Sequence, residues 1–425
     1  MVRYNNRFGG FGVVTDRFPL QGSPRSYASL VSRWLSEHLE VCLSDGAIDL
    51  QVPDLATLHQ RRSEKWSGQE SDVLASTVAE MDFPLAPEVT AALHAAIDRH
   101  DLGYTPATAT QLPAAFAGFA VRRLDWTVDQ DQITLVPDVM AGLIELCRVL
   151  VAPGEQVGFF TPAYPPFFVE LQQAQIELAQ LPLGATGAVD LDALEAALAG
   201  GVRALVLTNP HNPTGRVMPR AELEQIAELC AAYGCWVLAD EIHAPLVLEG
   251  ARHTPWLEVS DATRDRGIAL TSASKAFNVA GLKAALMITA SGRAREAVRR
   301  VPPLTDRVGL LGVIAAEAAF TYGDPWLDAV LDQLAANRRL LGDLLAAELP
   351  KIKWTPPEAS YLAWLDCRAL ALGDNPAETF LERGRIALSR GLDYGREGAG
   401  FVRLNFGTSP EHVTDAVRRM ATAIS

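Results

Sequence analysis

The sequence is poor in cysteine and has no long apolar run, and each shortage excludes a class of protein. Five cysteines are scattered over 425 residues without a CxxC pair, so neither a disulfide framework nor a zinc site is expected. No apolar run approaches the ~18 residues that a membrane span needs. Residues Met1 to Gly12 carry no apolar signal-peptide core. We therefore expect a protein of the reducing cytoplasm that binds no metal and no membrane.

Positive charge is also scarce. Lys and Arg number 37 against 51 Asp and Glu, which gives a net charge of −14. This balance argues against a nucleic-acid partner and against an anionic membrane surface. A hydrophobic content of 49% with 21% charged residues is ordinary for a globular chain. A chain of 425 residues is long enough to fold as more than one lobe.

Short apolar segments alternate with helical patterns through the middle of the chain. The predicted strands are 156–160, 204–208, 236–239 and 267–270, and the predicted helices are 87–98, 139–150, 191–198 and 220–233. This alternation predicts an α/β fold with a mostly parallel sheet and helices on both faces. After about residue 300 the pattern becomes helical, over 308–320 and 326–349. It ends in a smaller α+β lobe that contains 361–365 and 401–406.

The first 55 residues differ from the rest. Apolar residues at helical spacing in 29–43 predict a helix, which either packs on a partner subunit, covers a site, or belongs to a mobile extension. We divide the chain into an N-terminal extension (1–55), a large domain (91–320) and a small domain built from both ends of the remaining chain (56–90 and 321–425).

Four polar residues stand at predicted strand ends, where open α/β sheets place their ligands. Lys275 follows a buried strand among small hydroxyl residues, which suits a desolvated amine nucleophile. Asp240 closes another strand and needs a partner if buried. Asn212 lies in a loop stiffened by two prolines, and Arg403 lies between apolar strand residues, where it suits a carboxylate ligand. Taken singly, each has a plainer structural explanation, such as a surface lysine, a rigid turn or an ion pair.

Together these residues resemble the fold-type-I pyridoxal-phosphate (PLP) enzymes of the class I/II aminotransferase superfamily. Within it the sequence is most similar to the cystathionine β-lyase (MalY/PatB-like C–S lyase) subgroup. The resemblance runs from about residue 56 to the C-terminus. It is carried by Arg62–Trp66, Ala79–Phe83, Thr161–Phe167, Asp240–His243, Ser272–Leu282, Pro357–Asp366 and Val402–Gly407.

The resemblance implies a role for each residue around the cofactor ring. Lys275 would bind PLP as a Schiff base and then move the substrate Cα proton. Asp240 would keep the pyridine nitrogen protonated, and Asn212 would donate a hydrogen bond to the ring oxygen. His243 would lie near that oxygen, and Tyr164 would stack on the ring.

The phosphate group has its own implied partners. Ser272 and Lys283 would hold it together with the backbone N–H groups of Val139 and Met140 at a helix N-terminus. Tyr104 would reach the phosphate of the neighbouring subunit, so the resemblance implies a homodimer with shared active sites. Lys275, Asp240 and Tyr104 are therefore the predicted catalytic residues.

The substrate end is implied by three further residues. Arg403 would clamp the substrate α-carboxylate, and Ala79 and Glu80 would lie in the substrate pocket. Three positions depart from the subgroup's usual residues: Thr77 replaces Trp, Glu80 replaces Asp, and Asp138 replaces a Gly. Asp138 would repel a phosphate as an anion but is suitable as a helix N-cap.

The resemblance implies a PLP-dependent C–S β-lyase. Its substrate would be a small amino acid, a cysteine S-conjugate, and its products a thiol, pyruvate and ammonia. The alternative is a PLP-dependent aminotransferase that uses the same residues. A third possibility is a binding or regulatory protein that has lost catalysis.

Overall fold

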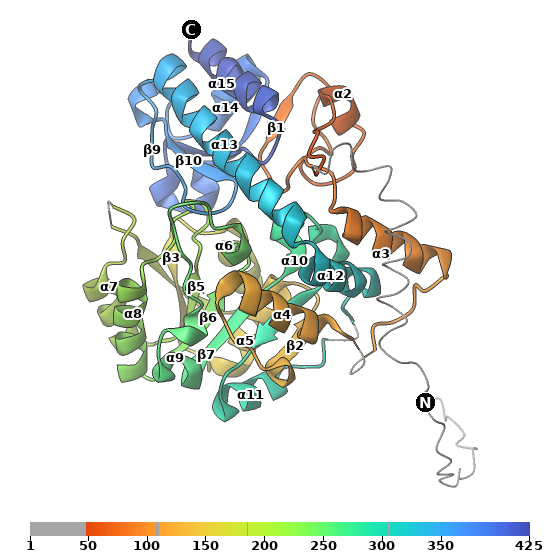
Figure 1. The fold of residues 1–425 in the computed structure, drawn as a ribbon. Coiled ribbons are helices and arrows are strands. Elements are labelled where there is room, and N and C mark those ends of the chain that lie inside the picture. The colour runs from red at the N-terminus through yellow and green to blue at the C-terminus, as the bar shows by residue number, and fades with distance from the viewer. Residues whose placement is uncertain (1–47, 107–109, 185, 305–306) are drawn as a thin grey trace, which may run out of the picture.

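The computed structural model describes residues 48–425 apart from 107–109, 185 and 305–306. The helix predicted at 29–43 lies outside the described residues. Two sheets organise the chain, one in each lobe (Figure 1). The larger sheet has seven strands, in the order β2 (Ile133–Val136), β8 (Ala285–Ile288), β7 (Gly267–Thr271), β6 (Trp236–Asp240), β5 (Val202–Thr208), β3 (Gln156–Thr161) and β4 (Glu177–Pro182).

The larger sheet is mostly parallel, as predicted. Only β8 runs antiparallel to its neighbours β2 and β7. Alternate residues of β5 belong to two different hydrophobic clusters, Leu205 and Leu207 to one and Ala204 and Val206 to the other. Both faces of the strand are therefore covered by apolar side chains, which explains its continuous apolar sequence.

Nine helices among the described residues belong to this part of the chain. They are α4 (Leu112–Leu124), α5 (Val139–Leu150), α6 (Pro165–Gln173), α7 (Leu191–Ala199), α8 (Arg220–Ala232), α9 (Asp261–Arg266), α10 (Ala273–Ala276), α11 (Gly292–Arg299) and α12 (Leu310–Tyr322). The predicted strands and helices are confirmed to within a few residues at each end.

The smaller sheet joins segments from the two ends of the described chain. Its five strands, in order, are β1 (Leu74–Ser76), β11 (Ile386–Arg390), β12 (Phe401–Asn405), β10 (Leu362–Asp366) and β9 (Lys353–Trp354). Because β1 pairs in parallel with β11, the small lobe contains both N- and C-terminal segments, as predicted. The remaining helices are α2 (Leu55–Leu58), α3 (Pro87–Asp98), α13 (Asp324–Glu348), α14 (Pro376–Gly384) and α15 (Pro410–Ile424). The exact domain boundaries stay a prediction.

The strand register of the larger sheet brings the chemistry together. Thr208 at the end of β5 pairs with Asp240 at the end of β6, and Asp240 pairs with Leu270 near the end of β7. Asn212 lies in the loop that follows β5, and Lys275 lies in α10 directly after β7. Since parallel strands end at the same edge of a sheet, these side chains meet there.

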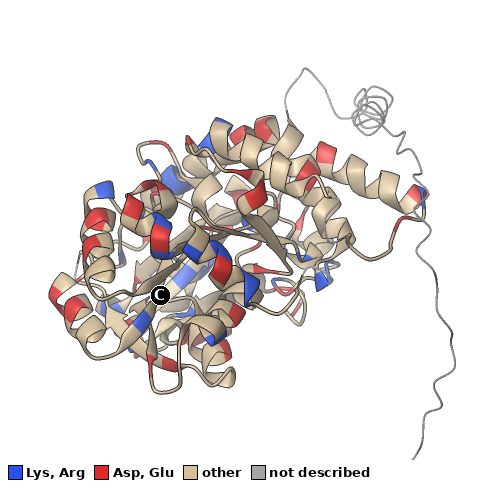
Figure 2. Ribbon diagram, turned by 90° about the horizontal axis from the view of Figure 1, so that it is seen from below, with Lys and Arg blue, Asp and Glu red and all other residues tan. Residues whose placement is uncertain are grey.

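Charged residues of both signs are mixed on the face that Figure 2 shows, without a broad area of positive charge. No helix of the described residues combines the length and apolarity that crossing a membrane requires.

Candidate active site

A cavity of about 300 Å³ lies at the carboxyl ends of the central strands. Most of the predicted site residues line it: Ala79, Val139, Met140, Tyr164, Asn212, Asp240, His243, Lys275 and Lys283. Asp138, whose role the sequence left open, also lines it. Residues that the sequence did not single out are Glu170, Thr208, Ile242, Ser274 and Ala280.

Lys275 lies in the short helix α10, directly after β7. Its amine donates a hydrogen bond to the Ala79 carbonyl oxygen at 3.0 Å. Burial, followed by the positive charge of Arg403, lowers the pKa of this amine to about 8, while Glu80 and Asp240 act in the opposite direction. A lysine in this state is partly uncharged near neutral pH, as a nucleophile or a base must be.

Asp240 and His243 are buried on the same side of the cavity. One carboxylate oxygen of Asp240 accepts a hydrogen bond from the Ile242 N–H at 3.2 Å. Burial nevertheless raises the pKa of Asp240 to about 6. Burial lowers the pKa of His243 to about 3, so this imidazole is neutral at pH 7. Its Nδ1 has no hydrogen-bond partner among the described residues.

Arg403 projects from β12 and is only 4% exposed. It donates to the Asn212 side-chain oxygen at 3.0 Å and to the Thr77 carbonyl oxygen at 2.9 Å. Its guanidinium lies 5.0 Å from the centre of the Tyr394 ring. It forms no ion pair within the described residues, and its Nε is buried without a partner. A buried cation without an anion is costly, so this arrangement favours an anionic ligand.

The N-terminus of α5 also lines the cavity. Asp138 is the N-cap of this helix and accepts a hydrogen bond from the Ala141 N–H at 2.7 Å. Its second oxygen lies 3.0 Å from the amine of Lys283. Glu170 on α6 lies nearby, and burial followed by the charge of Asp138 raises its pKa. Asp138 therefore has the N-cap geometry that its sequence suggested.

The structure places some predicted residues differently. Ser272 does not line the cavity: its hydroxyl donates to the Ala284 carbonyl oxygen at 2.7 Å and accepts from the Ser274 N–H at 3.0 Å. Glu80 is half-buried and does not line the cavity either. Tyr104 is 92% exposed, so its predicted contact with a neighbouring subunit stays a prediction.

Tyr361 is a residue that the sequence reasoning did not assign to the site. It is fully buried, and its hydroxyl donates to the Ala79 carbonyl oxygen at 2.8 Å, the oxygen that also accepts from Lys275. A buried tyrosine hydroxyl needs a hydrogen-bond partner. The position of Tyr361 directly before an apolar strand was therefore the sequence feature that could have indicated such a contact.

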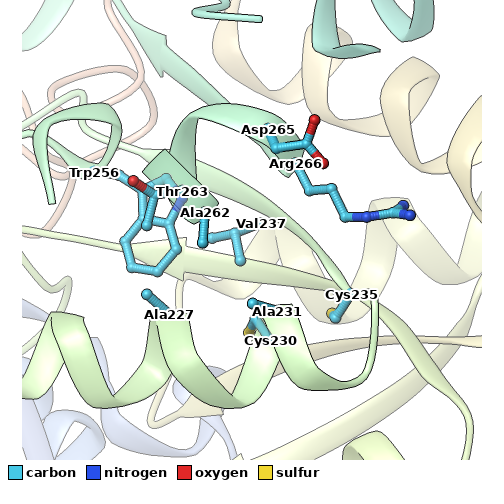
Figure 3. A pocket seen from close by; sticks show the side chains of 10 residues that line it. All are labelled: Ala227, Cys230, Ala231, Cys235, Val237, Trp256, Ala262, Thr263, Asp265 and Arg266. Atoms are coloured by element: carbon cyan, nitrogen blue, oxygen red, sulfur yellow. The ribbon is translucent and has the colours of Figure 1, made fainter. Parts of the chain in front are cut away.

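A second cavity of about 100 Å³ lies between α8, α9 and β6 (Figure 3). Cys230, Cys235 and Trp256 are among its lining residues. A hydrogen bond to Cys235, followed by burial, raises the pKa of the Cys230 thiol. Of the charged residues that line it, Asp265 pairs with Arg293 at 3.0 Å, and Arg266 lies over the Trp236 ring at 5.5 Å.

The residues of the first cavity fit a phosphorylated pyridine aldehyde. Lys275 supplies a largely desolvated amine, and Asp240 a buried carboxylate that forms no ion pair within the described residues. Lys283 and the first N–H groups of α5 suit a phosphate. The unpartnered nitrogens of His243 and Arg403 leave room for ligand contacts. The fold and this site define a fold-type-I PLP enzyme.

Comparisons with known proteins agree with this class. The family model for aminotransferase class I and II matches residues 73–420, and the chain belongs to this family. A candidate cystathionine beta-lyase from Mycobacterium leprae is 41% identical over 398 residues, which cover 88% of this chain and 98% of the relative. Cystathionine beta-lyase PatB of Bacillus subtilis is 36% identical, with 84% and 93% covered. The solved structure of a candidate PLP-dependent beta-cystathionase from Corynebacterium diphtheriae has a TM-score of 0.84 and 36% identity, with 88% and 99% covered.

Proposed function

We propose that this enzyme catalyses β-elimination from a cysteine S-conjugate. One water is consumed, the Cβ–S bond breaks, and a thiol, pyruvate and ammonium are released. One observation carries this proposal. The same site contains Arg403, a buried guanidinium without an anionic partner, and Lys275, an amine of lowered pKa. The lyase names of the relatives support the carbon–sulfur bond as the one that breaks.

Arg403 binds the substrate α-carboxylate in this proposal. Its fork of N–H groups is already fixed by Asn212 and Thr77, so little side-chain freedom is lost when the substrate binds. Its Nε is free to donate toward the ligand.

Lys275 moves the proton at Cα. When bound, PLP delocalises the negative charge that develops on this carbon. The Lys275 amine has a pKa of about 8 instead of the usual 10.5, so about 300-fold more of it is neutral at pH 7. A positioned base of this kind contributes a factor of roughly 10²–10⁴ to the rate.

Asp240 keeps a proton on the pyridine nitrogen. Its pKa of about 6 leaves the carboxylate largely ionised at pH 7, and a cation beside it would lower that pKa further. The neutral His243 adds no positive charge that would compete with this pair.

An aminotransferase acting on a dicarboxylic substrate finds less support. Such a substrate would need a second cation for its distal carboxylate. The cations that line the cavity among the described residues are Lys275 and Lys283, and the carboxylates Asp138 and Glu170 lie next to Lys283.

The assembly and the compartment belong to the same proposal. We propose a homodimer, supported by the exposure of Tyr104 beside the buried Thr105 and by the half-exposed apolar side chains of Ile97 and Leu102. We also propose a reducing, cytoplasmic location. The four cysteines of the described residues are all buried free thiols, which supports it.

The test is turnover without a keto acid. The purified, PLP-loaded enzyme is mixed with S-ethyl-cysteine, and free thiol and pyruvate are measured. Equal amounts of both are expected. Turnover that begins only when 2-oxoglutarate or pyruvate is added would replace the lyase by an aminotransferase.

A further inference from the structure

A backbone segment without strand partners crosses the wall of the active site. It runs from Thr77 to Asp82, directly after β1, and we call it the carbonyl strip. Each of its six carbonyl oxygens accepts a hydrogen bond from a side chain. Buried carbonyl groups need such partners, so side chains here replace the ladder of a sheet.

The carbonyl strip holds two cations, Arg403 and Lys275. Arg403 donates to the Thr77 oxygen at 2.9 Å, and Lys275 donates to the Ala79 oxygen at 3.0 Å. The Asn405 side chain ties down the two other carbonyls nearby, those of Val78 at 2.6 Å and Glu80 at 2.7 Å. The cations are thus fixed relative to each other by neutral dipoles. A contacting carboxylate would instead stabilise the charged amine and occupy the guanidinium.

The Ala79 oxygen is shared between two donors. Tyr361 donates to it at 2.8 Å and Lys275 at 3.0 Å. Because Tyr361 is fully buried, its hydroxyl cannot turn to water. A hydroxyl that donates to a carbonyl oxygen places its positive end there, which weakens that oxygen as an acceptor for a cationic amine.

We propose that Tyr361 is a positioning residue for Lys275. Acting through the Ala79 carbonyl, it fixes the direction of the amine and limits how well this oxygen stabilises the charged form. The proposal rests on the proposed role of Lys275 but not on the identity of the substrate.

Tyr361→Phe leaves in the chain all the charged groups that act on the amine. Charges face it from Arg403 on β12, Asp240 on β6, Glu80 on the carbonyl strip and Lys283 after α10. The neutral His243 ring lies 6.4 Å from the Tyr361 ring. Removing the Tyr361 hydroxyl alone therefore isolates its influence on the amine.

The experiment compares Tyr361→Phe with the parent chain. Full-length protein freed of PLP is labelled with acetic anhydride at a series of pH values, and the peptide that contains residue 275 is quantified by mass spectrometry. The amine pKa of the variant is expected to rise by at least half a unit, so labelling at pH 7 falls about threefold. Tyr394→Phe is the matched control, because it removes the hydroxyl of a buried tyrosine that contacts Arg403, and it leaves the labelling profile unchanged.

The kinetic constants of the PLP-loaded variants provide a second test of the proposed role of Tyr361. With S-ethyl-cysteine, Tyr361→Phe is expected to lower kcat while KM changes less than twofold, because the Thr77 contact of Arg403 is untouched. General loosening of the carbonyl strip would change both constants. An unchanged labelling profile in Tyr361→Phe, or an equal shift in Tyr394→Phe, would overturn the proposal. Labelling needs no substrate, so this result is independent of whether the enzyme is a lyase.

Discussion

Two cavities of this protein bury an amine and a thiol, groups that can act as nucleophiles in enzymes. Burial has opposite effects on the reactivity of these two groups. Around Lys275 burial lowers the pKa to about 8, toward the neutral amine that reacts. In the smaller cavity a hydrogen bond to Cys235, followed by burial, raises the pKa of Cys230, away from the thiolate that reacts. Burial contributes to both shifts, since it disfavours the charged form of either group. The reactive form is neutral for an amine and charged for a thiol.

The origins of the two cavities also differ. Gly234, at φ +63°, ends α8. The Cys235 N–H donates to the Cys230 carbonyl oxygen at 2.8 Å, and the Gly234 N–H donates to the Ala231 carbonyl oxygen at 3.1 Å. This is a Schellman motif, in which the side chains at the positions of Cys230 and Cys235 normally touch. Local chain geometry thus explains the cysteine pair, whereas the polar groups around Lys275 come from distant parts of the sequence.

The largest effect is expected from Lys275→Ala. This change removes the amine that would bind PLP and move the proton, and turnover of S-ethyl-cysteine should fall by a factor of about 10²–10⁴. Cys230→Ala, the corresponding change in the smaller cavity, should leave turnover within twofold. Borohydride reduction of PLP-loaded parent protein followed by peptide mapping should place the adduct on residue 275. An adduct on another lysine would show that Lys275 is not the amine that binds PLP.

A smaller loss is expected from Arg403→Lys. Lysine keeps the charge but cannot replace the guanidinium fork that contacts Asn212 and Thr77. We expect KM for S-ethyl-cysteine to rise about 10- to 100-fold, or ~1.4–2.8 kcal/mol. Arg396→Lys is the matched control, because this arginine is exposed and pairs with Glu397. A variant with unchanged KM would show that Arg403 does not bind the carboxylate.

The sequence predicted the fold well because its signals are local. Apolar runs such as 204–208 and 236–239 became β5 and β6, and their parallel register then brought Asn212 and Asp240 to the same edge of the sheet. Lys275 follows the neighbouring parallel strand β7, so it lies at the same edge of the sheet.

The contacts made by the backbone could not be predicted. The partner of Lys275 is the carbonyl of Ala79, and any residue at position 79 offers the same oxygen. The sharing of that oxygen with Tyr361 depends on how the two lobes pack. For Ser272 the sequence suggested a phosphate ligand, whereas its hydroxyl caps α10 and bonds to Ala284 in the structure.

Asp138→Asn should change cofactor affinity more moderately, and in the favourable direction. Asparagine is as good an N-cap as aspartate, so α5 keeps its cap while the anion beside Lys283 is removed. We expect the Kd for PLP to fall about tenfold, or ~1.4 kcal/mol, as one unfavourable charge near the phosphate disappears. Spectrophotometric titration measures this.

Pyridoxal, which lacks the phosphate, separates this effect from a general one. Its affinity should be the same in Asp138→Asn and in the parent protein. Asp190→Asn is the matched control, because Asp190 caps α7 by accepting from the Ala193 N–H at 3.0 Å and does not line the cavity. Equal gains for PLP and pyridoxal would show that the Asp138 charge does not act on the phosphate.

The smallest effect concerns stability in the second cavity. The folded protein keeps the Cys230 proton to a pH well above the ordinary thiol pKa of 9.0. An unfolded chain releases it near that value, so the folded state loses stability as the pH rises above 9.

Cys230→Ala should lower the free energy of unfolding by about 1 kcal/mol at pH 7, because packing is lost. This difference from the parent protein should fall by about 1.4 kcal/mol per pH unit above 9 and so vanish by pH 10, because the variant has no thiol there to ionise. Urea denaturation at pH 7 and pH 10 measures both values. A constant difference would mean that the folded state does not retain the Cys230 proton above pH 9, as the comparison requires.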